Sequence, residues 1–482
     1  MDETEISQIK DKTTVSIIFL TLRNFGIQGI SMIGFFLLTI LLGRGDVGLF
    51  AIVAESVGIL GYFSDVGLAS ALIQQKEKPN KSELQTTFAI QQVLVVIALF
   101  IVIIIYPKIS LSKGYGSQEL WILVSLCFSF AVASLKTIPS ILLERELNFK
   151  LLSTIDIVEN TTFYFFAVLF AFLGFGVFAY AIATFIRSLL GLIAIYYYSP
   201  WPIGLSFSKD SAKRLFKYGI PFQLNSFIAV AKDRLSNLLV AGIIGRDSFG
   251  ILSWAQKGPR VPLSFMDAIM RVTFPTFSRI QDQTDFLKRS IEKSIYFIAL
   301  FVFPTLAGIS LLAPDVINSI PKYSQWLPAL APMYLFAINA GIASVTTPLT
   351  NAFNAVGKIH ITTKLMIMWT VLTWIFYPLL SLKYGYMGTA IATLIVGSSS
   401  AVVWIIASQV FKINVFRVIL HPFIATVIMT SVLYLLNFAN LNSLANIFAK
   451  IIIGSVVYLG YSLYFTKNEL VWFVTQAKWL KK

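Results

Sequence analysis

The stretch Ser253-Trp254-Ala255-Gln256-Lys257-Gly258-Pro259-Arg260, continuing through Asp267 and Arg271, lies inside a hydrophobic segment long enough to cross a bilayer. It carries four charged residues, Lys257, Arg260, Asp267 and Arg271, which fall on one stripe if the segment is a single helix. Charged groups are costly at membrane depth and normally face a bundle interior or a wet cavity, so the stripe is a candidate ligand-binding surface. The alternative is that these side chains snorkel or pair internally without touching a ligand.

The composition is that of a polytopic membrane protein. Of 482 residues, 57% are hydrophobic and 13% are charged, whereas soluble proteins average about 25% charged residues. The apolar runs are continuous for about 20 residues, which favours helices over a β-barrel. We therefore predict an all-α fold with about 14 transmembrane helices. The predicted windows are 15–41, 47–72, 84–106, 119–143, 151–173, 176–198, 219–244, 248–276, 291–313, 327–353, 361–381, 386–410, 416–436 and 445–465.

The charge distribution predicts the topology and excludes some functions. The formal net charge is +15, and loops assigned to the cytoplasm hold about 23 basic residues against about six outside, which places both termini in the cytoplasm. No water-exposed basic domain is present, so we predict no nucleic-acid partner. The single cysteine and two histidines exclude a disulfide framework and a histidine cluster, so we predict no metal and no cofactor.

An internal repeat organises the chain. A shift of 202 positions places Gly43-Arg44 on Gly245-Arg246 and Gly48 on Gly250. Six predicted spans separate the copies, so the repeat is parallel, with its axis along the membrane normal. The predicted domains are a six-helix lobe at 1–198, a cytoplasmic linker at 199–218, a second six-helix lobe at 219–411, and two extra helices with a basic amphipathic tail at 412–482.

The repeat also pairs two polar stripes. The residues of the second span that coincide with Lys257, Arg260, Ser264 and Asp267 are Glu55, Gly58, Tyr62 and Asp65. One lobe thus offers acid where the other offers base, and repeat-built transporters place their sites at such a lobe interface.

Further polar residues lie in other spans. The first span carries Arg23, Asn24 and Gln28, and the seventh carries Lys232-Asp233-Arg234, which can partly neutralise itself. A second group (Lys136, Asp156, Glu159 and Arg187) is predicted near the cytoplasmic interface, where snorkelling is cheap and a structural role is equally open. Spans thirteen and fourteen are predicted to carry no buried charge and to serve in packing or to face lipid.

Two segments resemble a known family. Residues 32–75 and 232–281 resemble the polysaccharide transport family of the multidrug/oligosaccharidyl-lipid/polysaccharide exporter superfamily, and most of all its Wzx-type O-antigen and exopolysaccharide flippases. The first contains the run LLGRGDVGLFAIVAESVGILGYFSDVGLASALIQQ and the second the run GILSWAQKGPRVPLSFMDAIMRVTFPTFSRIQ. The resemblance implies a two-lobed, alternating-access transporter of the bacterial cytoplasmic membrane. It would move a polyprenyl-diphosphate-linked oligosaccharide between leaflets.

The residue chemistry suits that substrate. Arg and Lys give charge-assisted hydrogen bonds to phosphate, and amides suit sugars. The candidate substrate-binding residues are Arg23, Asn24, Gln28, Arg234, Lys257, Arg260 and Arg271. The candidates for ion coupling or gating are Glu55, Asp65, Asp233 and Asp267, with H⁺ or Na⁺ as the coupling ion. Membrane lipids and other polysaccharide assembly proteins are the further expected partners.

Two rival functions stay open at this point. A cation-coupled multidrug exporter of the same superfamily would share the lobes without needing a basic interior. An integral-membrane glycan polymerase or ligase would need a large external loop with catalytic groups, and the predicted external loops are short. The prediction is therefore a transporter and not an enzyme, and the absence of a GxxxxGK[ST] sequence argues against ATP hydrolysis in cis.

Overall fold

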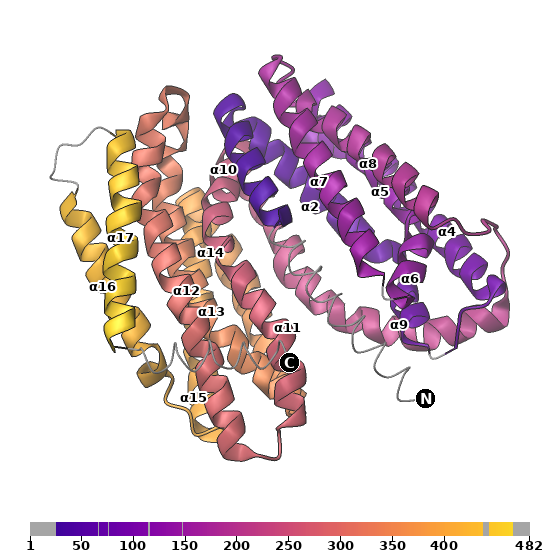
Figure 1. The fold of residues 1–482 in the computed structure, drawn as a ribbon. Helices are drawn as coiled ribbons and strands as arrows, with labels where there is room; N and C mark the ends of the chain where they lie inside the picture. Colours follow the sequence, from indigo (N-terminus) through magenta and orange to yellow (C-terminus); the bar gives the residue numbers. More distant parts are fainter. Residues whose placement is uncertain are drawn as a thin grey trace. The chain divides into compact units, whose positions relative to one another are not determined.

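The protein is an all-helical, multi-pass membrane protein. A computed structural model describes residues 26–65, 67–75, 77–113, 116–146, 148–436 and 443–465, and these are helical with short connections (Figure 1). Within them, eleven helical stretches are long and apolar enough to cross a membrane, and a shorter apolar helix runs from Gly26 to Leu41. The prediction of an all-α polytopic fold is confirmed.

The chain divides into two compact units, Met1–Gly250 and Ile251–Lys482. The helices of the first unit are α2 (Arg44–Asp65), α3 (Leu68–Gln74), α4 (Lys81–Lys113), α5 (Ser117–Leu135), α6 (Thr137–Arg145), α7 (Phe149–Phe172), α8 (Phe178–Tyr198), α9 (Lys209–Val230) and the π-helical turn η1 (Ala231–Leu235). Helix α10 (Ser236–Arg260) contains the boundary between the units. The lobe limits predicted from the sequence stay a prediction.

The second unit continues from the end of α10. Its helices are α11 (Leu263–Arg279), α12 (Thr284–Ser319), the 3₁₀ segment η2 (Pro321–Ala329), α13 (Leu330–Ala355), α14 (Ile359–Ser398), α15 (Ala401–Val410), α16 (Val415–Leu435) and α17 (Ser443–Phe465). Helices α12, α16 and α17 pack on one another along their length (Figure 1).

Two glycines divide long helical stretches where the sequence windows predicted breaks. Gly245 has φ 77° inside α10, and Gly385 has φ 59° inside α14. Positive φ strains residues that carry a Cβ, and glycine adopts it freely. Each glycine therefore ends one helix and begins another, so the 52-residue stretch Ile359–Val410 holds two of the predicted spans.

The single helix predicted over 248–276 is wrong. Helix α10 ends at Arg260 and α11 begins at Leu263, and the intervening turn is closed by the N–H of Val261 donating to the carbonyl of Gly258 at 3.1 Å. Pro259 and Pro262 cause the break, because proline lacks an N–H and its ring clashes with the preceding turn. The predicted charged stripe is thus split between two helices.

The repeat brings its two copies into reciprocal contact inside the first unit. A Cβ on Gly48 would overlap the carbonyl oxygen of Arg246, and a Cβ on Gly250 would overlap the carbonyl oxygen of Arg44. The backbone of the arginine in each copy thus packs directly against the glycine of the other copy. Such symmetry follows if the two segments are equivalent, so the contact supports the 202-residue repeat.

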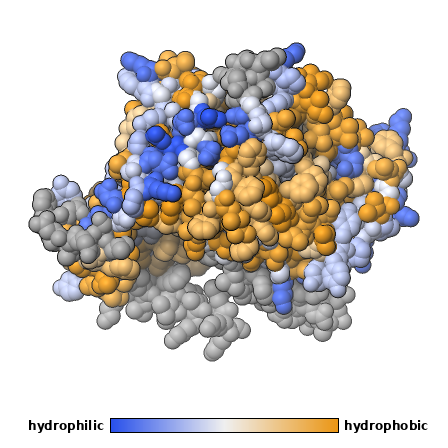
Figure 2. Space-filling model, turned by 90° about the horizontal axis from the view of Figure 1, so that it is seen from above, coloured by the Kyte–Doolittle hydropathy of each residue, from blue (hydrophilic) through white to orange (hydrophobic). Residues whose placement is uncertain are grey.

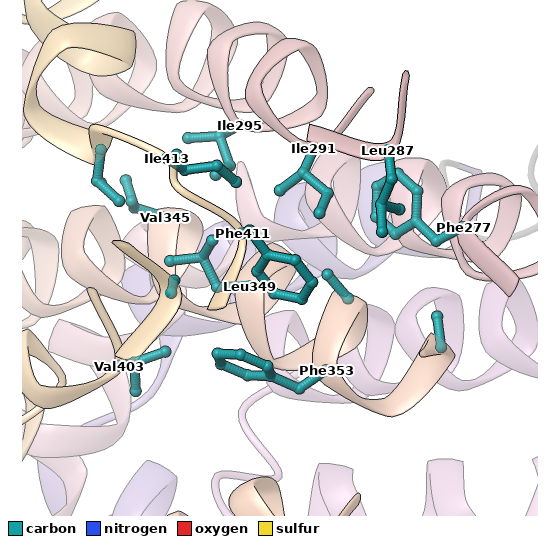
Figure 3. Packing of buried hydrophobic residues seen from close by; sticks show 14 of the residues in the cluster. Phe277, Leu287, Ile291, Ile295, Val345, Leu349, Phe353, Val403, Phe411 and Ile413 are labelled. Atoms are coloured by element: carbon teal, nitrogen blue, oxygen red, sulfur yellow. The ribbon is translucent and has the colours of Figure 1, made fainter. Parts of the chain in front are cut away.

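The core of the second unit fixes the orientation of α13. Val345, Leu349 and Phe353 of α13 belong to one buried cluster with Ile291 and Ile295 of α12 (Figure 3). All five are less than 2% exposed, and their spacing places the three α13 residues on one helical face. Burial of a large apolar side chain is worth about 1.5–3 kcal/mol, so this face locks the rotation of α13.

Apolar side chains also cover much of the outer surface. Figure 2 shows extensive hydrophobic areas, with hydrophilic side chains gathered in limited patches. A soluble protein rarely exposes apolar patches larger than a few hundred Å², whereas lipid-facing helices do so as a rule.

Candidate functional site

A polar recess of about 460 Å³ lies in the second unit between α11 and α13. Its lining residues are Asp267, Met270 and Arg271 from α11 and Thr347, Thr350, Asn351 and Asn354 from α13. It combines a carboxylate, a guanidinium, two hydroxyls and two amides in one hollow. A recess with so many convergent polar groups in a mostly apolar protein is a candidate ligand site.

Local sequence explains why α13 contributes four polar residues. Thr347, Thr350, Asn351 and Asn354 follow the spacing of one helical face. The residues of the other face are buried in the core of the unit, so the polar face is turned away from it. The Asn351 Nδ2 donates to Thr273 Oγ1 at 3.5 Å, which leaves most of the hydrogen-bonding capacity of the amide for a ligand.

The charges of α11 are exposed. Asp267 and Arg271 both face solvent-accessible space, and among the ion pairs closer than 4.0 Å in the described residues neither takes part. Asp267 interacts electrostatically with Arg260 and Arg271, and Lys257 with Arg260. The four predicted charges of the stripe therefore remain one electrostatic group across the break between α10 and α11. Only Asp267 and Arg271 line the recess.

The first unit holds a second polar group of predicted residues. Arg234 Nη1 lies 3.1 Å from Glu55 Oε2, and Asn237 Nδ2 donates to Glu55 Oε1 at 3.4 Å. Arg234 lies across α2 at Gly58, where a Cβ would overlap the guanidinium. Glu55 thus has its basic partner within its own unit, and Asn237 is a partner that sequence reasoning missed.

The remaining predicted residues are less informative. Lys232 Nζ lies 2.9 Å from Asp233 Oδ1, so this adjacent pair does neutralise itself. Gln28 is half-buried on the helix Gly26–Leu41. Arg23, Asn24 and the side chain of Asp65 lie outside the described residues.

An ion cluster centred on the buried Glu159 joins α7 and α8 to Lys136, the residue between α5 and α6. Glu159 is 6% exposed and lies 2.6 Å from Lys136 Nζ and 3.7 Å from Arg187 Nε. Gly191 makes room for it, since a Cβ there would overlap the carboxylate. Three residues of the group predicted near the cytoplasmic interface are thus paired with one another inside the first unit.

The expectation that the last two spans carry no buried charge is wrong. Lys450 of α17 is 2% exposed, and its Nζ lies 2.5 Å from Asp315 Oδ2 of α12. Asn446 Nδ2 donates to the other carboxylate oxygen at 3.2 Å. A lysine in a lipid-facing helix would be costly, so its partner on α12 explains why it can be buried there.

The side chains of the recess can bind sugars and anionic groups. Within the described residues, no group of three His, Cys, Asp or Glu side chains could hold a metal ion. Hydroxyls and amides donate to and accept from sugar hydroxyls, and a guanidinium binds phosphate or carboxylate with two parallel hydrogen bonds. The Thr/Asn face of α13 was not predicted from the sequence, although the sequence shows these residues at helical spacing.

Comparisons with known proteins agree with these features. A family model described as "Polysaccharide biosynthesis protein" matches residues 37–331. The teichuronic acid biosynthesis protein TuaB of Bacillus subtilis is 23% identical over 384 residues, which cover 76% of each chain. The lipopolysaccharide biosynthesis protein WzxC of Escherichia coli is 24% identical over 379 residues, which cover 76% of this chain and 74% of its own.

Solved structures share the fold. Lipid II flippase MurJ in an inward closed conformation superposes with a TM-score of 0.71 at 17% identity, covering 96% of this chain and 99% of its own. The Vibrio cholerae MATE transporter VcmN superposes with a TM-score of 0.53 at 13% identity, covering 86% of this chain and 100% of its own. At these identities the likeness concerns the fold alone.

Proposed function

Since this chain belongs to the polysaccharide biosynthesis protein family and has a transporter fold, we propose that it is a flippase for polyprenyl-diphosphate-linked oligosaccharide. It moves a repeat unit of O-antigen, exopolysaccharide or capsule across the bacterial cytoplasmic membrane by alternating access. The protein acts as a transporter and not as an enzyme. The recess between α11 and α13 is the observation that carries this proposal.

The recess binds two kinds of group, anionic groups and sugar hydroxyls. Arg271 holds a phosphate or an acidic sugar, because a guanidinium makes paired, charge-assisted hydrogen bonds to such groups. Thr347, Thr350 and Asn351 hold sugar hydroxyls. Asp267 accepts from a sugar hydroxyl or, as a coupling carboxylate, takes up H⁺ or Na⁺.

Other predicted residues have supporting roles. Lys257 and Arg260 extend the positive field of Arg271 towards the end of α10, and positive fields concentrate anionic ligands. Glu55, held by Arg234 and Asn237, is the coupling or gating carboxylate of the first unit. Asp233, Asp65, Arg23, Asn24 and Gln28 stay proposals of the same kind.

The topology completes the proposal. Two six-helix lobes at 1–198 and 219–411, joined by a linker at 199–218, would rock about the substrate, and both termini would lie in the cytoplasm. Helices α16 and α17 are an addition to the second lobe.

The test follows the substrate itself. In cells lacking the protein, lipid-linked oligosaccharide should accumulate on the cytoplasmic leaflet, and the wild-type gene should restore export. Arg271→Ala should fail to restore it, while Arg279→Ala, in the last turn of the same helix and outside the recess, should succeed. Full export with Arg271→Ala would contradict the assigned site.

The rival of the same fold is a drug exporter. It predicts that the wild-type gene raises resistance to cationic drugs and leaves the position of lipid-linked oligosaccharide unchanged. The two outcomes exclude one another in a single strain, so the comparison decides between the two functions.

A further inference from the structure

A cavity of about 780 Å³ lies wholly inside the first unit, between α2, α4, α5 and α10. It shares no residue with the recess on α11 and α13 or with the Glu55–Arg234 pair. Its walls come from the middle of α2 (Leu49 to Leu60), the later part of α4, the beginning of α5, and α10 from Leu238 to Arg246. Glu119 lies in the first turn of α5 and Arg246 directly follows the break at Gly245, so these two charged residues mark one end of the cavity.

The walls of the cavity are apolar over the length of one leaflet. Leu49, Val53, Val57 and Leu60 line it along one face of α2. Eleven residue steps at about 1.5 Å each give about 16 Å, close to half of a hydrocarbon core of about 30 Å. The cavity therefore fits a hydrocarbon chain that extends through a single leaflet.

One end of the cavity is charged. Arg246 Nη1 lies 2.9 Å from Glu119 Oε1, and the other oxygen of Glu119 accepts from the N–H of Gly116 at 2.8 Å. The Glu119 side chain is 9% exposed, whereas that of Arg246 is 50% exposed. Glu119 thus fixes the arginine with one of its five N–H groups, and the exposed part of the guanidinium can receive a further acceptor.

The surroundings of Arg246 specify the charge of the ligand. Asp46 lies within electrostatic range of both Arg246 and Asp247, and Glu119 adds a third carboxylate. A doubly anionic headgroup such as a diphosphate would be repelled by these carboxylates. A headgroup with one phosphate and one ammonium is complementary, because the phosphate meets Arg246 and the ammonium meets the carboxylates.

We propose that this cavity binds a phospholipid with a zwitterionic headgroup of the phosphatidylethanolamine type. One acyl chain fills the groove along α2, the phosphate binds Arg246, and the ammonium group lies towards Asp46 and Glu119. On the proposed topology the lipid belongs to the outer leaflet. The bound lipid is a resident component and not the transported substrate.

The chain offers a matched pair of variants. Gly242 lines the cavity, and a Cβ on it would meet no atom within 4 Å, so Gly242→Phe fills the cavity without a clash at the branch point. Gly460 of α17 is equally open and lies outside the cavity, so Gly460→Phe is the control. Ser56→Phe, from the opposite wall, is a second filling variant if Gly242→Phe does not fold.

The experiment measures lipid retention and thermal stability. The full-length protein is purified in detergent and incubated with palmitoyl-oleoyl phosphatidylethanolamine, the corresponding phosphatidylglycerol or a polyprenyl phosphate, and bound lipid is counted by native mass spectrometry. We expect wild type and Gly460→Phe to retain phosphatidylethanolamine, and we expect the bound lipid to raise their melting temperature. Gly242→Phe or Ser56→Phe should lose both effects, and Arg246→Gln should bind phosphatidylethanolamine at least 5-fold more weakly, as expected for about 1 kcal/mol from a lost hydrogen bond.

Three results would overturn the proposal. Equal retention by wild type and the filling variants would place the lipid elsewhere. Preference for the polyprenyl phosphate would make the cavity part of the substrate path. Equal binding of both phospholipids would remove the headgroup assignment. Each result is independent of whether the protein transports oligosaccharide.

Discussion

Two acid–base pairs of the second unit have opposite surroundings. Asp315 and Lys450 are 2.5 Å apart, and the lysine is 2% exposed. Asp267 and Arg271 are exposed on α11, interact only through space, and line a recess with hydroxyls and amides. Asp315 and Lys450 neutralise each other and join α12 to α17. Asp267 and Arg271 instead present their charges to a ligand.

The contrast gives a criterion for charges inside a membrane protein. A buried charge whose hydrogen bonds go to a partner within the fold contributes to the packing of helices. A charge that lines a cavity and is largely exposed keeps hydrogen-bonding capacity for a ligand. On this criterion Glu159, with Lys136 and Arg187, belongs with the first kind.

The largest effect is expected from breaking the buried pair. Lys450→Met leaves the largely buried Asp315 carboxylate without its ion partner, which should lower the free energy of unfolding by about 3 kcal/mol. Denaturant unfolding in mixed micelles measures this. The double variant Asp315→Leu with Lys450→Met should recover most of the loss, because no charge is then buried alone. A double variant as unstable as the single one would show that the pair is not what joins α12 to α17.

A change in the recess should affect transport and leave stability nearly unchanged. Arg271→Ala should reduce transport about 10- to 100-fold, since a hydrogen bond to a charged group is worth about 1.5–3 kcal/mol. The free energy of unfolding should stay within about 0.5 kcal/mol of wild type. Arg271→Lys keeps the charge without the planar fork and should restore part of the activity. A large loss of stability would move Arg271 into the class of Lys450.

A neutral residue of the same recess should have a smaller effect. Asn351→Leu removes one hydrogen-bonding amide and should reduce transport about 5-fold, as expected for about 1 kcal/mol. Gln409→Leu, an exposed site on α15 outside the recess, is the control. Equal transport by Asn351→Leu and the control would remove α13 from the binding surface.

The half-exposed pair of the first unit should have the least effect on stability. Arg234 is 45% exposed and Glu55 is 27% exposed, so Glu55→Gln should cost at most about 1 kcal/mol of unfolding free energy. Transport by the Glu55→Gln variant should nevertheless no longer depend on the proton or sodium gradient if Glu55 is the coupling carboxylate. Unchanged gradient dependence in reconstituted vesicles would exclude that role.

The sequence predicts much of the fold and less of the site. Apolar windows and the breaks at Gly245 and Gly385 follow from hydropathy and local geometry. The Lys450 partner was not predictable, because Asp315 lies 135 residues away in the chain and only packing brings them together. The recess was partly predictable, since Asp267 and Arg271 stood out as charges in an apolar segment.

Two features of the site required the structure. The prolines at 259 and 262 were visible, yet whether they kink or end a helix depends on the neighbouring turn. The Thr/Asn face of α13 has a regular spacing, but small polar residues also mediate helix packing in membranes. Only the core packing of the opposite face shows that these residues line a hollow.

The most direct measurement of the central claim is the leaflet distribution of lipid-linked oligosaccharide in a deletion strain. The strain carries wild type, Arg271→Ala or Arg279→Ala at equal membrane levels, and a lectin or enzyme probe reads the outer leaflet. We predict outer-leaflet signal for wild type and Arg279→Ala, and a signal reduced at least 10-fold for Arg271→Ala, in line with the charge-assisted bonds that it loses. Equal outer-leaflet signal in all strains, including the deletion, would contradict the account.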